Sequence, residues 1–403
     1  MRLKMILRRI SAINTVIIAE IKLYIWQAPD WPRWRYRLDE LEPLLDQAAR
    51  LQGRLYGRLA DVGFEVQAQT SLSALTEDVV KSSAIEGEVL SPESVRSSIA
   101  RRLGLEQAAL APVDRHVDGI VQMMLDATSR ANEPLTAQRL FGWHAALFPN
   151  GYSGLVPITV GDWRSDALGP MQVVSGPVDA GVVGAMIGSS RRQKVHYEAP
   201  PASILSRQMD IFMDWVNQPN PSQPGLIRAA IGHLWFVTLH PFDDGNGRIG
   251  RAIGDLLLAR ADHSNQRFYS LSAEIQAQRK AYYDILEATQ KSSMDITPWL
   301  LWFLSQLVQA LQTAHATVDS ALVKTKFWHY WAGVSLNPRQ IKILNRLLDG
   351  FDARLTTSRW GSMTKCSPDT ALRDITQLIE LGILCKSAGG GRSTSYELTQ
   401  AHR

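Results

Sequence analysis

Apolar residues recur at helical spacing along most of this 403-residue chain, and this pattern constrains the fold more than any other feature. Side chains that repeat every three or four residues lie on one face of a helix and can be buried together. The segments with this pattern are 41–51, 72–85, 117–125, 136–147, 202–216, 226–239, 250–261, 273–289 and 298–311. The sequence therefore predicts a mainly α protein.

One stretch interrupts the helical pattern. Residues 150–176 read NGYSGLVPITVGDWRSDALGPMQVVSG, in which glycines, prolines and β-branched residues predict a loop with a short hairpin. The run from Met171 to Val174 is the expected strand. Two helix boundaries are also marked locally: Gly87 is expected just after one helix, and Ser91 is expected to cap the next, with Pro92 in its first turn.

The N-terminal region has two parts. Residues 1–22 have a basic start and a short apolar run, which resembles a weak signal peptide. Glu20 and Lys22 interrupt that run well short of the ~20 apolar residues that span a bilayer, so we expect an unstructured leader and no membrane partner. Trp26, Trp31 and Trp34 then surround two prolines, which predicts an extended arm held by aromatic contacts; Pro43 is expected in the first turn of the following helix.

The last 70 residues follow a different layout. Helices are expected after Asn337-Pro338 and after Ser367-Pro368, with a weaker helical signal at 356–363 between them, and two short strands around a glycine turn follow. This order is typical of a winged helix-turn-helix. The two cysteines, Cys366 and Cys385, cannot form a disulfide framework or a four-ligand zinc site, which favours a reducing cytoplasm.

The charge of the C-terminal region makes DNA a candidate partner. Twelve Lys and Arg stand against six Asp and Glu from residue 321 onward. The expected recognition helix, 368–381, offers few cations, however. It is expected to expose Thr370, Arg373, Gln377, Asp369 and Asp374, with Lys386 and Arg392 on the wing. A dimerising or protein-binding role for this region is therefore equally open.

The sequence HPFDDGNGRIGR, residues 240–251, concentrates unlike polar groups in one loop. His240 is expected at the end of a helix, because Pro241 disfavours helical backbone at the residue before it. A neutral imidazole there can accept a proton from a hydroxyl group and so act as a general base. The carboxylate of either Asp243 or Asp244 would suit Mg²⁺ beside bound phosphates.

The glycines and arginines of the same loop point to an anion. Gly245-Asn246-Gly247 lets successive backbone N–H groups turn toward one point, and a helix starting there adds its positive end. Arg248 and Arg251 are three residues apart and can face the same side of that helix. Each element alone is common: a structural histidine, a solvated turn, a surface pair of arginines. Their combination in this order predicts a phosphoryl or nucleotidyl transfer site.

HPFDDGNGRIGR resembles, position by position, the signature HxFx(D/E)GNGRxxR of the Fic (filamentation induced by cAMP) family. The intact glycines and arginines resemble the adenylylating members, whereas the Doc-type kinases diverge there. The resemblance implies a helical Fic fold with a β-hairpin flap and a reaction in which AMP passes from ATP to a Ser, Thr or Tyr hydroxyl of a target protein or of the enzyme itself. It makes His240 the base and Asp244 the Mg²⁺ ligand. The implied nucleotide-binding residues are Gly245, Asn246, Gly247, Arg248, Gly250 and Arg251.

A second match lies upstream. The sequence SSAIEG, residues 82–87, resembles the family's inhibitory motif (S/T)xxxE(G/N). Glu86 near a helix C-terminus is disfavoured by the helix dipole unless a cation offsets it. The resemblance makes Arg251 that cation, so that Glu86 denies it to the γ-phosphate of ATP. The alternative for Glu86 is a surface glutamate before a helix-ending glycine.

The resemblance also bears on the rest of the chain. The strand near Met171 matches the family's flap, which pairs with an extended target segment. Tyr282 and Tyr283 are candidates to flank the adenine, or else to pack in the core. The expected domains are a leader at 1–22, an N-terminal helical domain with the inhibitory helix at 23–115, a Fic domain at 116–315 and a winged helix at 330–403.

Three functions remain open at this stage. The first is AMP transfer with ATP and Mg²⁺, inhibited by Glu86. The second is removal of AMP in the same fold, with Glu86 positioning a water. The third is a DNA-binding regulator whose Fic region senses nucleotide. The candidate partners are ATP, a target protein, a second copy of the chain and DNA.

Overall fold

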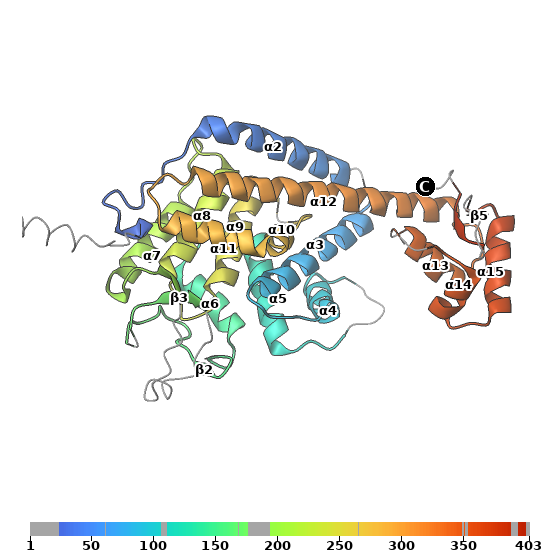
Figure 1. Cartoon of the computed structure of the whole chain (residues 1–403), viewed down its shortest axis with the longest axis horizontal. Coiled ribbons are helices and arrows are strands. Elements are labelled where there is room, and N and C mark those ends of the chain that lie inside the picture. Colours follow the sequence, from blue (N-terminus) through green and yellow to red (C-terminus); the bar gives the residue numbers. More distant parts are fainter. Residues whose placement is uncertain are drawn as a thin grey trace, which may run out of the picture. The chain divides into compact units, whose positions relative to one another are not determined.

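The computed structural model describes residues 24–60, 62–105, 111–167, 169–175, 194–264, 266–348, 350, 354–387 and 394–399. The expected leader and Arg392 lie outside these residues. The described residues are mainly helical, as the periodicity predicted (Figure 1).

The helices begin and end as follows: η1 (Ile25–Gln27), α2 (Leu38–Ala60), α3 (Phe64–Ile85), α4 (Pro92–Arg102), α5 (Arg115–Ser129), α6 (Ala137–Leu147), α7 (Ala202–Asn217), α8 (Gly225–Leu239), α9 (Asn246–Ala261), α10 (Leu271–Ala277), α11 (Arg279–Gln290), α12 (Thr297–Tyr330), α13 (Pro338–Leu348), α14 (Thr357–Thr364) and α15 (Pro368–Glu380). The strands are β1 (Tyr152–Ser153), β2 (Val156–Pro157), β3 (Gln172–Ser175), β4 (Lys194–Glu198), β5 (Leu384–Lys386) and β6 (Tyr396–Leu398).

The chain divides into two compact units, one built from residues up to 54 and 71–311, the other from 55–70 and residues from 312 onward. The expected border between residues 115 and 116 therefore lies inside the first unit. Helix α12 extends to Tyr330, well beyond the expected end at residue 311. Among the described helices, none combines the length and the apolar character needed to cross a bilayer.

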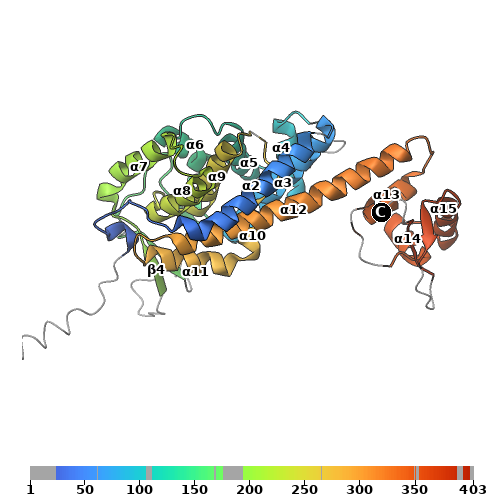
Figure 2. The same ribbon diagram turned by 90° about the horizontal axis from the view of Figure 1, so that it is seen from above.

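Helix α8 lies at the centre of the first unit. Its sequence is apolar nearly all round, and every residue from Leu226 to Leu239 is buried, as expected for a helix surrounded by others. It packs against α7 and α9, while α5 and α6 contact α9 (Figures 1 and 2). Close approach depends on Gly232, where an added Cβ would lie 2.4 Å from a methyl of Leu257. This packing fixes the loop that joins α8 to α9.

Several predicted boundaries are confirmed. The Ser91 hydroxyl accepts a hydrogen bond from Ser94 N at the start of α4, and Gly87 has the positive φ of 87° expected after α3. The prediction for Pro43 was wrong, because α2 begins at Leu38 and encloses the proline. Acidic residues in the first turn of α2 stabilise that earlier start through the helix dipole.

Two hairpins interrupt the helices. β1 pairs with β2 and β3 pairs with β4, both antiparallel, so the strand expected near Met171 is present. The hydroxyl of buried Tyr197 on β4 donates to Thr238 O on α8 at 2.6 Å. Trp26 Nε1 donates to Glu198 O at 2.8 Å. The aromatic arm thus helps hold the second hairpin beside α8.

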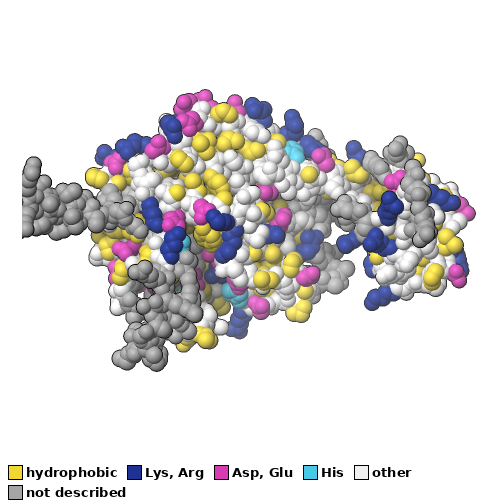
Figure 3. Space-filling view, viewed as in Figure 1, with side chains coloured by type: hydrophobic (Ala, Val, Ile, Leu, Met, Phe, Trp, Pro, Cys, Tyr) yellow, Lys and Arg dark blue, Asp and Glu magenta, His cyan; other side chains and the backbone are white. Residues whose placement is uncertain are grey.

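The second unit contains α13, α14 and α15 followed by the antiparallel pair β5 and β6. Its core is built around fully buried Trp360. The elements follow the expected order, but identification as a winged helix stays a prediction. Asp374 differs from expectation: it is buried, because Arg339 donates to both of its carboxylate oxygens at 2.7 and 3.0 Å. On the face seen in Figure 3, Lys and Arg side chains are prominent on this unit.

Candidate active site

The loop between α8 and α9 is closed by its own asparagine. The buried side chain of Asn246 accepts from Phe242 N at 2.9 Å and donates to Phe242 O at 2.7 Å. Phe242 is fully buried and so anchors the loop in the core. The side chain of Asn246 therefore shapes the loop. Its backbone N–H belongs to the first turn of α9, because Asn246 is the first residue of this helix.

His240 follows the last residue of α8 and has left-handed backbone, with φ 50° and ψ 57°. Its Nδ1 lies 3.2 Å from Val237 O. Since a carbonyl can only accept, Nδ1 carries the proton and Nε2 keeps a free lone pair. Burial lowers the pKa of His240 to about 4, with the nearby Arg164 charge acting in the same direction. The imidazole is thus neutral at pH 7, as a general base requires.

Arg164 holds the backbone on which His240 sits. Its side chain is fully buried; Nε donates to His240 O at 2.7 Å and its backbone N donates to Pro241 O at 3.0 Å. Nη1 pairs with Asp166 at 2.8 Å, and Asp166 in turn accepts from Ala202 N at the start of α7 at 2.6 Å. Sequence reasoning missed this arginine, because its partners are distant backbone carbonyls that leave no local pattern.

His144 supports the same loop from α6 and was also missed. Its ring stacks on Phe242 with centroids 4.2 Å apart and planes 6° apart. Its Nε2 lies 3.2 Å from Asp244 O, which accepts the hydrogen bond. Burial lowers the pKa of His144, so the ring packs as a neutral group. The loop is therefore fixed from α6 as well as from Arg164.

The glycines at the start of α9 make room for a carboxylate. Gly245 has a φ of 80°, which glycine adopts without strain. A Cβ on Gly247 would lie only 2.0 Å from Oε1 of Glu86. The Glu86 carboxylate thus sits directly over this glycine, at a helix N-terminus whose N–H groups and dipole attract anions.

Arg251 makes the contact expected with Glu86. Its Nη1 lies 2.8 Å from Glu86 Oε1, and the guanidinium also donates to Ser82 Oγ at 2.9 Å and to Ser82 O at 2.8 Å. Tyr283 donates to the other Glu86 oxygen at 3.4 Å. The structure therefore brings the two predicted motifs together, with Ser82 as an additional partner of Arg251.

Arg248 is held by a carboxylate that the sequence did not single out. Its Nη1 donates to Glu88 Oε2 at 3.0 Å, and its guanidinium lies over the Phe148 ring at 5.2 Å from the centroid. Glu88 also contacts His116. A cavity of about 410 Å³ is lined by these groups together with Glu86 and Asp244. The two arginines of the loop thus face separate carboxylates of the segment 86–88.

Asp244 lines this cavity with a donor set that suits Mg²⁺. Its Oδ2 accepts from the Ser153 hydroxyl, and its Oδ1 accepts from Gly245 N at 2.6 Å. Within the described ranges no group of three or more His, Cys, Asp and Glu forms a metal cage. One carboxylate beside a site for phosphate groups is nevertheless what Mg²⁺ uses when phosphate oxygens and water complete its shell. The residues therefore fit an ion that arrives with a nucleotide.

The sequence profile of the Fic/DOC family matches residues 134–258, which span α6 to α9 and the whole loop. This region of the chain is a Fic/DOC family domain. A second profile, "Domain of unknown function (DUF4172)", matches residues 24–105, which include α2, α3 and α4. The segment that carries Glu86 and Glu88 thus belongs to a different conserved module from the loop it contacts.

Curated relatives match the Fic region of the chain. One from Nematostella vectensis, named protein adenylyltransferase Fic, is 31% identical over 131 residues, which are 32% of this chain and 27% of the relative. One of the same name from Culex quinquefasciatus is 34% identical over 118 residues, 28% of this chain and 22% of the relative. This Fic protein thus spans about a quarter of their length. A crystal structure of a Fic family protein from Desulfovibrio desulfuricans G20 is 19% identical, with a TM-score of 0.47, over 89% of this chain and 96% of that one.

The structure also shows the surroundings of three other candidate residues, Gly250, Tyr282 and Tyr283. A Cβ on Gly250 would lie 2.7 Å from Val237 on α8, so this glycine allows α8 and α9 to pack closely; its role in nucleotide binding stays a prediction. Tyr282 is buried and its hydroxyl lies 2.9 Å from His233 Nε2, which fits core packing. Tyr283 remains partly exposed and contacts Glu86 and Ile85 O, the latter at 3.2 Å.

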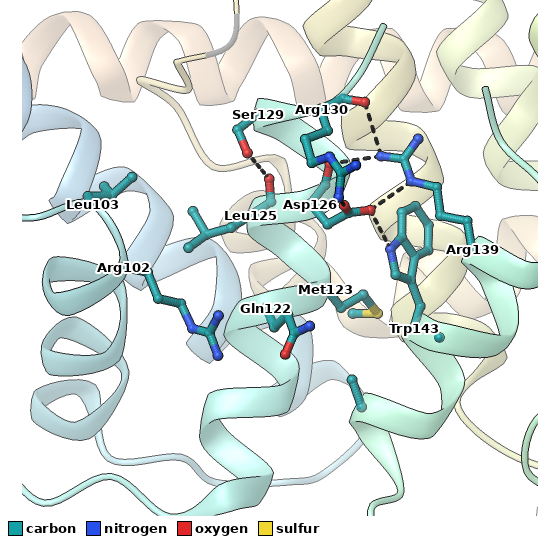
Figure 4. A pocket seen from close by; sticks show the side chains of 12 residues that line it. Arg102, Leu103, Gln122, Met123, Leu125, Asp126, Ser129, Arg130, Arg139 and Trp143 are labelled. Atoms are coloured by element: carbon teal, nitrogen blue, oxygen red, sulfur yellow. Dashed lines mark hydrogen bonds and ion pairs between the residues drawn. The ribbon is translucent and has the colours of Figure 1, made fainter. Parts of the chain in front are cut away.

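A second cavity of the Fic protein, of about 440 Å³, lies among α4, α5 and α6. Figure 4 shows Asp126 between Arg139 and Trp143, both of which donate to its Oδ2 at 2.7 Å. Arg130 pairs with Asp126 as well, at 3.2 Å. Arg130 and Arg139 are therefore both paired with Asp126 at this cavity.

Proposed function

We propose that this Fic protein is a protein adenylyltransferase that transfers AMP from ATP to a Ser, Thr or Tyr hydroxyl of a target protein or of itself. The observation that carries the proposal is the neutral His240, with Nε2 unprotonated, beside the helix start and two arginines of one loop. The relatives that match the Fic region are named protein adenylyltransferases, which supports the same reaction class.

The residues suggest how the reaction proceeds. His240 Nε2 takes the proton of the target hydroxyl as its oxygen bonds to the α-phosphorus of ATP. The bond from that phosphorus to the bridging oxygen breaks, and pyrophosphate leaves. The backbone N–H groups at the start of α9 bind phosphate oxygens, while Arg248 and Arg251 offset the charge of the leaving group. Asp244 would hold Mg²⁺, which when bound neutralises phosphate charge.

We further propose that the observed arrangement is the inhibited one. Glu86 Oε1 lies 2.8 Å from Arg251 Nη1 and directly over Gly247. A γ-phosphate would need Arg251. A phosphate bound by the N–H groups at the start of α9 would need the space that the Glu86 carboxylate fills. Productive ATP binding therefore requires that Glu86 leave.

Labelled ATP tests both proposals. Purified wild-type protein, Glu86→Gly and Glu86→Gly/His240→Ala would be incubated with Mg²⁺ and host lysate, then scored by gel and intact mass. We expect label on protein with Glu86→Gly, little with wild type and none with the double variant. Glu133→Gly, which removes an exposed glutamate from a turn, is the matched control and should behave as wild type. Equal label in the double variant would exclude His240 as the base.

Removal of AMP is a second candidate at the same site. The observation that favours it is the position of the Glu86 carboxylate inside the phosphate cradle, where it could orient a water for attack on a bound AMP ester. AMP release from a labelled target would then occur with wild type and be lost in Glu86→Gly. Label transfer only by Glu86→Gly, without AMP release by wild type, would support transfer alone.

DNA binding by the second unit is a separate candidate. Because Asp374 is buried against Arg339, the exposed face of α15 carries less negative charge than the sequence suggested, and Arg373 and Gln377 remain exposed there. Binding of duplex DNA by the full chain that weakens with salt and with Arg373→Ala would support it. Salt-independent self-association would instead favour a dimerising role.

A further inference from the structure

Glu88 bridges two cations of the loop cavity. Its Oε2 accepts from Arg248 Nη1 at 3.0 Å, and its Oε1 contacts His116 Nε2 on α5. Arg248 is nearly buried, while Glu88 and His116 are about one-third exposed, with side-chain exposures of 30% and 37%. All three line the cavity that Glu86 and Asp244 also line. One carboxylate is therefore shared by an arginine and a histidine at the edge of the phosphate cradle.

The surroundings of His116 require a charged ring. Its Nδ1 lies 3.2 Å from Leu147 O, and its Nε2 faces the Glu88 carboxylate. A carbonyl and a carboxylate only accept, so both ring nitrogens must donate, which is possible only for the imidazolium. The hydrogen bond to Glu88 raises the pKa of His116 against the opposing effects of burial and of Arg248.

The electrostatics of Glu88 agree with this assignment. Partial burial and the nearby Asp114 charge would raise the pKa of Glu88, but the hydrogen bond and charge of His116 and the charge of Arg248 outweigh them and lower it. The charged groups that act on His116 are thus Glu88 after α3 and Arg248 on α9, while Asp114 before α5 acts on Glu88. Glu86 and Asp244 line the same cavity.

We propose that His116 is a third cation of the polyphosphate site, and that the Glu88 carboxylate occupies the place that one phosphate group of a nucleoside triphosphate takes. This rests on the proposed nucleotide site. A carboxylate presents two oxygens to two donors as a phosphate does, so a phosphate that displaces Glu88 meets Arg248 and His116 already oriented. The geometry of segment 86–88 supports the pairing: Glu86 holds Arg251, Glu88 holds Arg248, and Gly87 between them has a φ of 87°.

Calorimetric titration of the full chain with ATP and Mg²⁺ tests the proposal. Glu88→Gln keeps the shape but removes the competing charge, so ATP should bind about tenfold more tightly, as expected for one charge-assisted hydrogen bond. Adding His116→Gln to this variant should weaken ATP binding about tenfold. Adenosine, which has no phosphates, should bind all variants equally, and urea unfolding would verify that each variant is folded.

The pH dependence separates a phosphate contact from a structural effect. An imidazolium binds phosphate and a neutral imidazole does not, so ATP affinity of Glu88→Gln should fall as pH rises from 6 to 8.5. The ionisation of ATP itself is common to all variants. The ATP affinity of Glu88→Gln divided by that of Glu88→Gln/His116→Gln should therefore decrease toward one as pH rises.

Two results would overturn the inference. If Glu88→Gln/His116→Gln binds ATP as tightly as Glu88→Gln at every pH, His116 does not contact the phosphates. Weaker ATP binding by Glu88→Gln than by wild type would show that Glu88 does not compete with phosphate. Because binding is measured without any transfer, failure of the adenylyltransferase proposal would appear separately, as normal ATP binding without labelled protein.

Discussion

Glu86 and Arg251 form an ion pair of 2.8 Å between the end of α3 and the second turn of α9. The side chain of Arg251 is only 2% exposed, so without Glu86 the guanidinium would keep its hydrogen bonds to Ser82 but lose the carboxylate that balances its charge. Leaving a buried charge unpaired is costly, which makes the paired arrangement the stable one in the absence of nucleotide. An entering triphosphate supplies a replacement anion, so Glu86 and the triphosphate compete for the same arginine.

Ser82 and Ser83 provide a matched test of how Arg251 is held. Ser82→Ala removes the acceptor of Arg251 Nε and should lower the free energy of unfolding by about 1–2 kcal/mol. Ser83 is equally buried, but its hydroxyl has no hydrogen-bond partner, so Ser83→Ala should be neutral or stabilising. Urea unfolding of the two variants, which share the same gain in helix propensity, measures the difference. Equal effects would contradict the role given to Ser82.

Gly247 is predicted to couple to Glu86. A Cβ there would overlap Glu86 Oε1, so Gly247→Ala should destabilise the wild-type protein by about 1–3 kcal/mol. In the Glu86→Gly background the overlap is gone, and the same change should cost less by about 1 kcal/mol or more. Urea unfolding of the four proteins gives this coupling energy.

The same variants test whether phosphate groups bind at the start of α9. Although Gly247→Ala pushes Glu86 away, it should not activate the protein, because the methyl group also fills the place of a phosphate. Labelled ATP should therefore give no labelled protein in either background. Transfer by Glu86→Gly/Gly247→Ala at the level of Glu86→Gly would place the phosphates elsewhere.

Apart from the Glu86–Arg251 pair, which followed from the family resemblance, the parts of the site that the sequence predicted are those with local causes. The segment from His240 to Arg251 is short and runs from the end of α8 into the first turns of α9, so residue order alone indicated its shape. The Ser91 cap and Gly87 likewise depend on neighbours a few residues away. Helix α12 was predicted too short because polar residues after Leu311 weaken the apolar periodicity while still favouring helix.

The missed features depend on partners far along the chain. Arg164 holds backbone carbonyls at His240 and Pro200, and His116 meets Glu88 only because α5 packs beside α4. Nothing in a single sequence marks such pairs. Asp374 is a further example: its position on the helix predicted an exposed side chain, whereas in the structure Arg339, a distant residue, packs against it.

Arg164 should be the most sensitive position outside the loop. Arg164→Gln leaves Asp166 as an unpaired carboxylate and frees the carbonyls at His240 and Pro200, so the free energy of unfolding should fall by about 3–5 kcal/mol. Arg164→Lys should recover only part of this, because one ammonium cannot reach all three acceptors. Arg207→Gln, on the exposed face of α7, is the control and should stay within about 0.5 kcal/mol of wild type. A small effect of Arg164→Gln would mean that the loop holds its shape unaided.

The pH profile of label transfer follows from the state of His240. Burial lowers the pKa of this ring to about 4, and the reaction needs the neutral form, so activity is lost as pH falls through that value. With Glu86→Gly and saturating ATP, the rate should be nearly constant from about pH 6 to 8 and fall about tenfold per pH unit below the pKa. An unburied histidine would give a midpoint near 6.5 instead. Single-turnover transfer from labelled ATP, with circular dichroism at each pH to verify folding, measures the profile. A midpoint near 6.5 would mean that the ring becomes solvated when Glu86 is removed, and that the dry environment of His240 depends on the inhibitory segment.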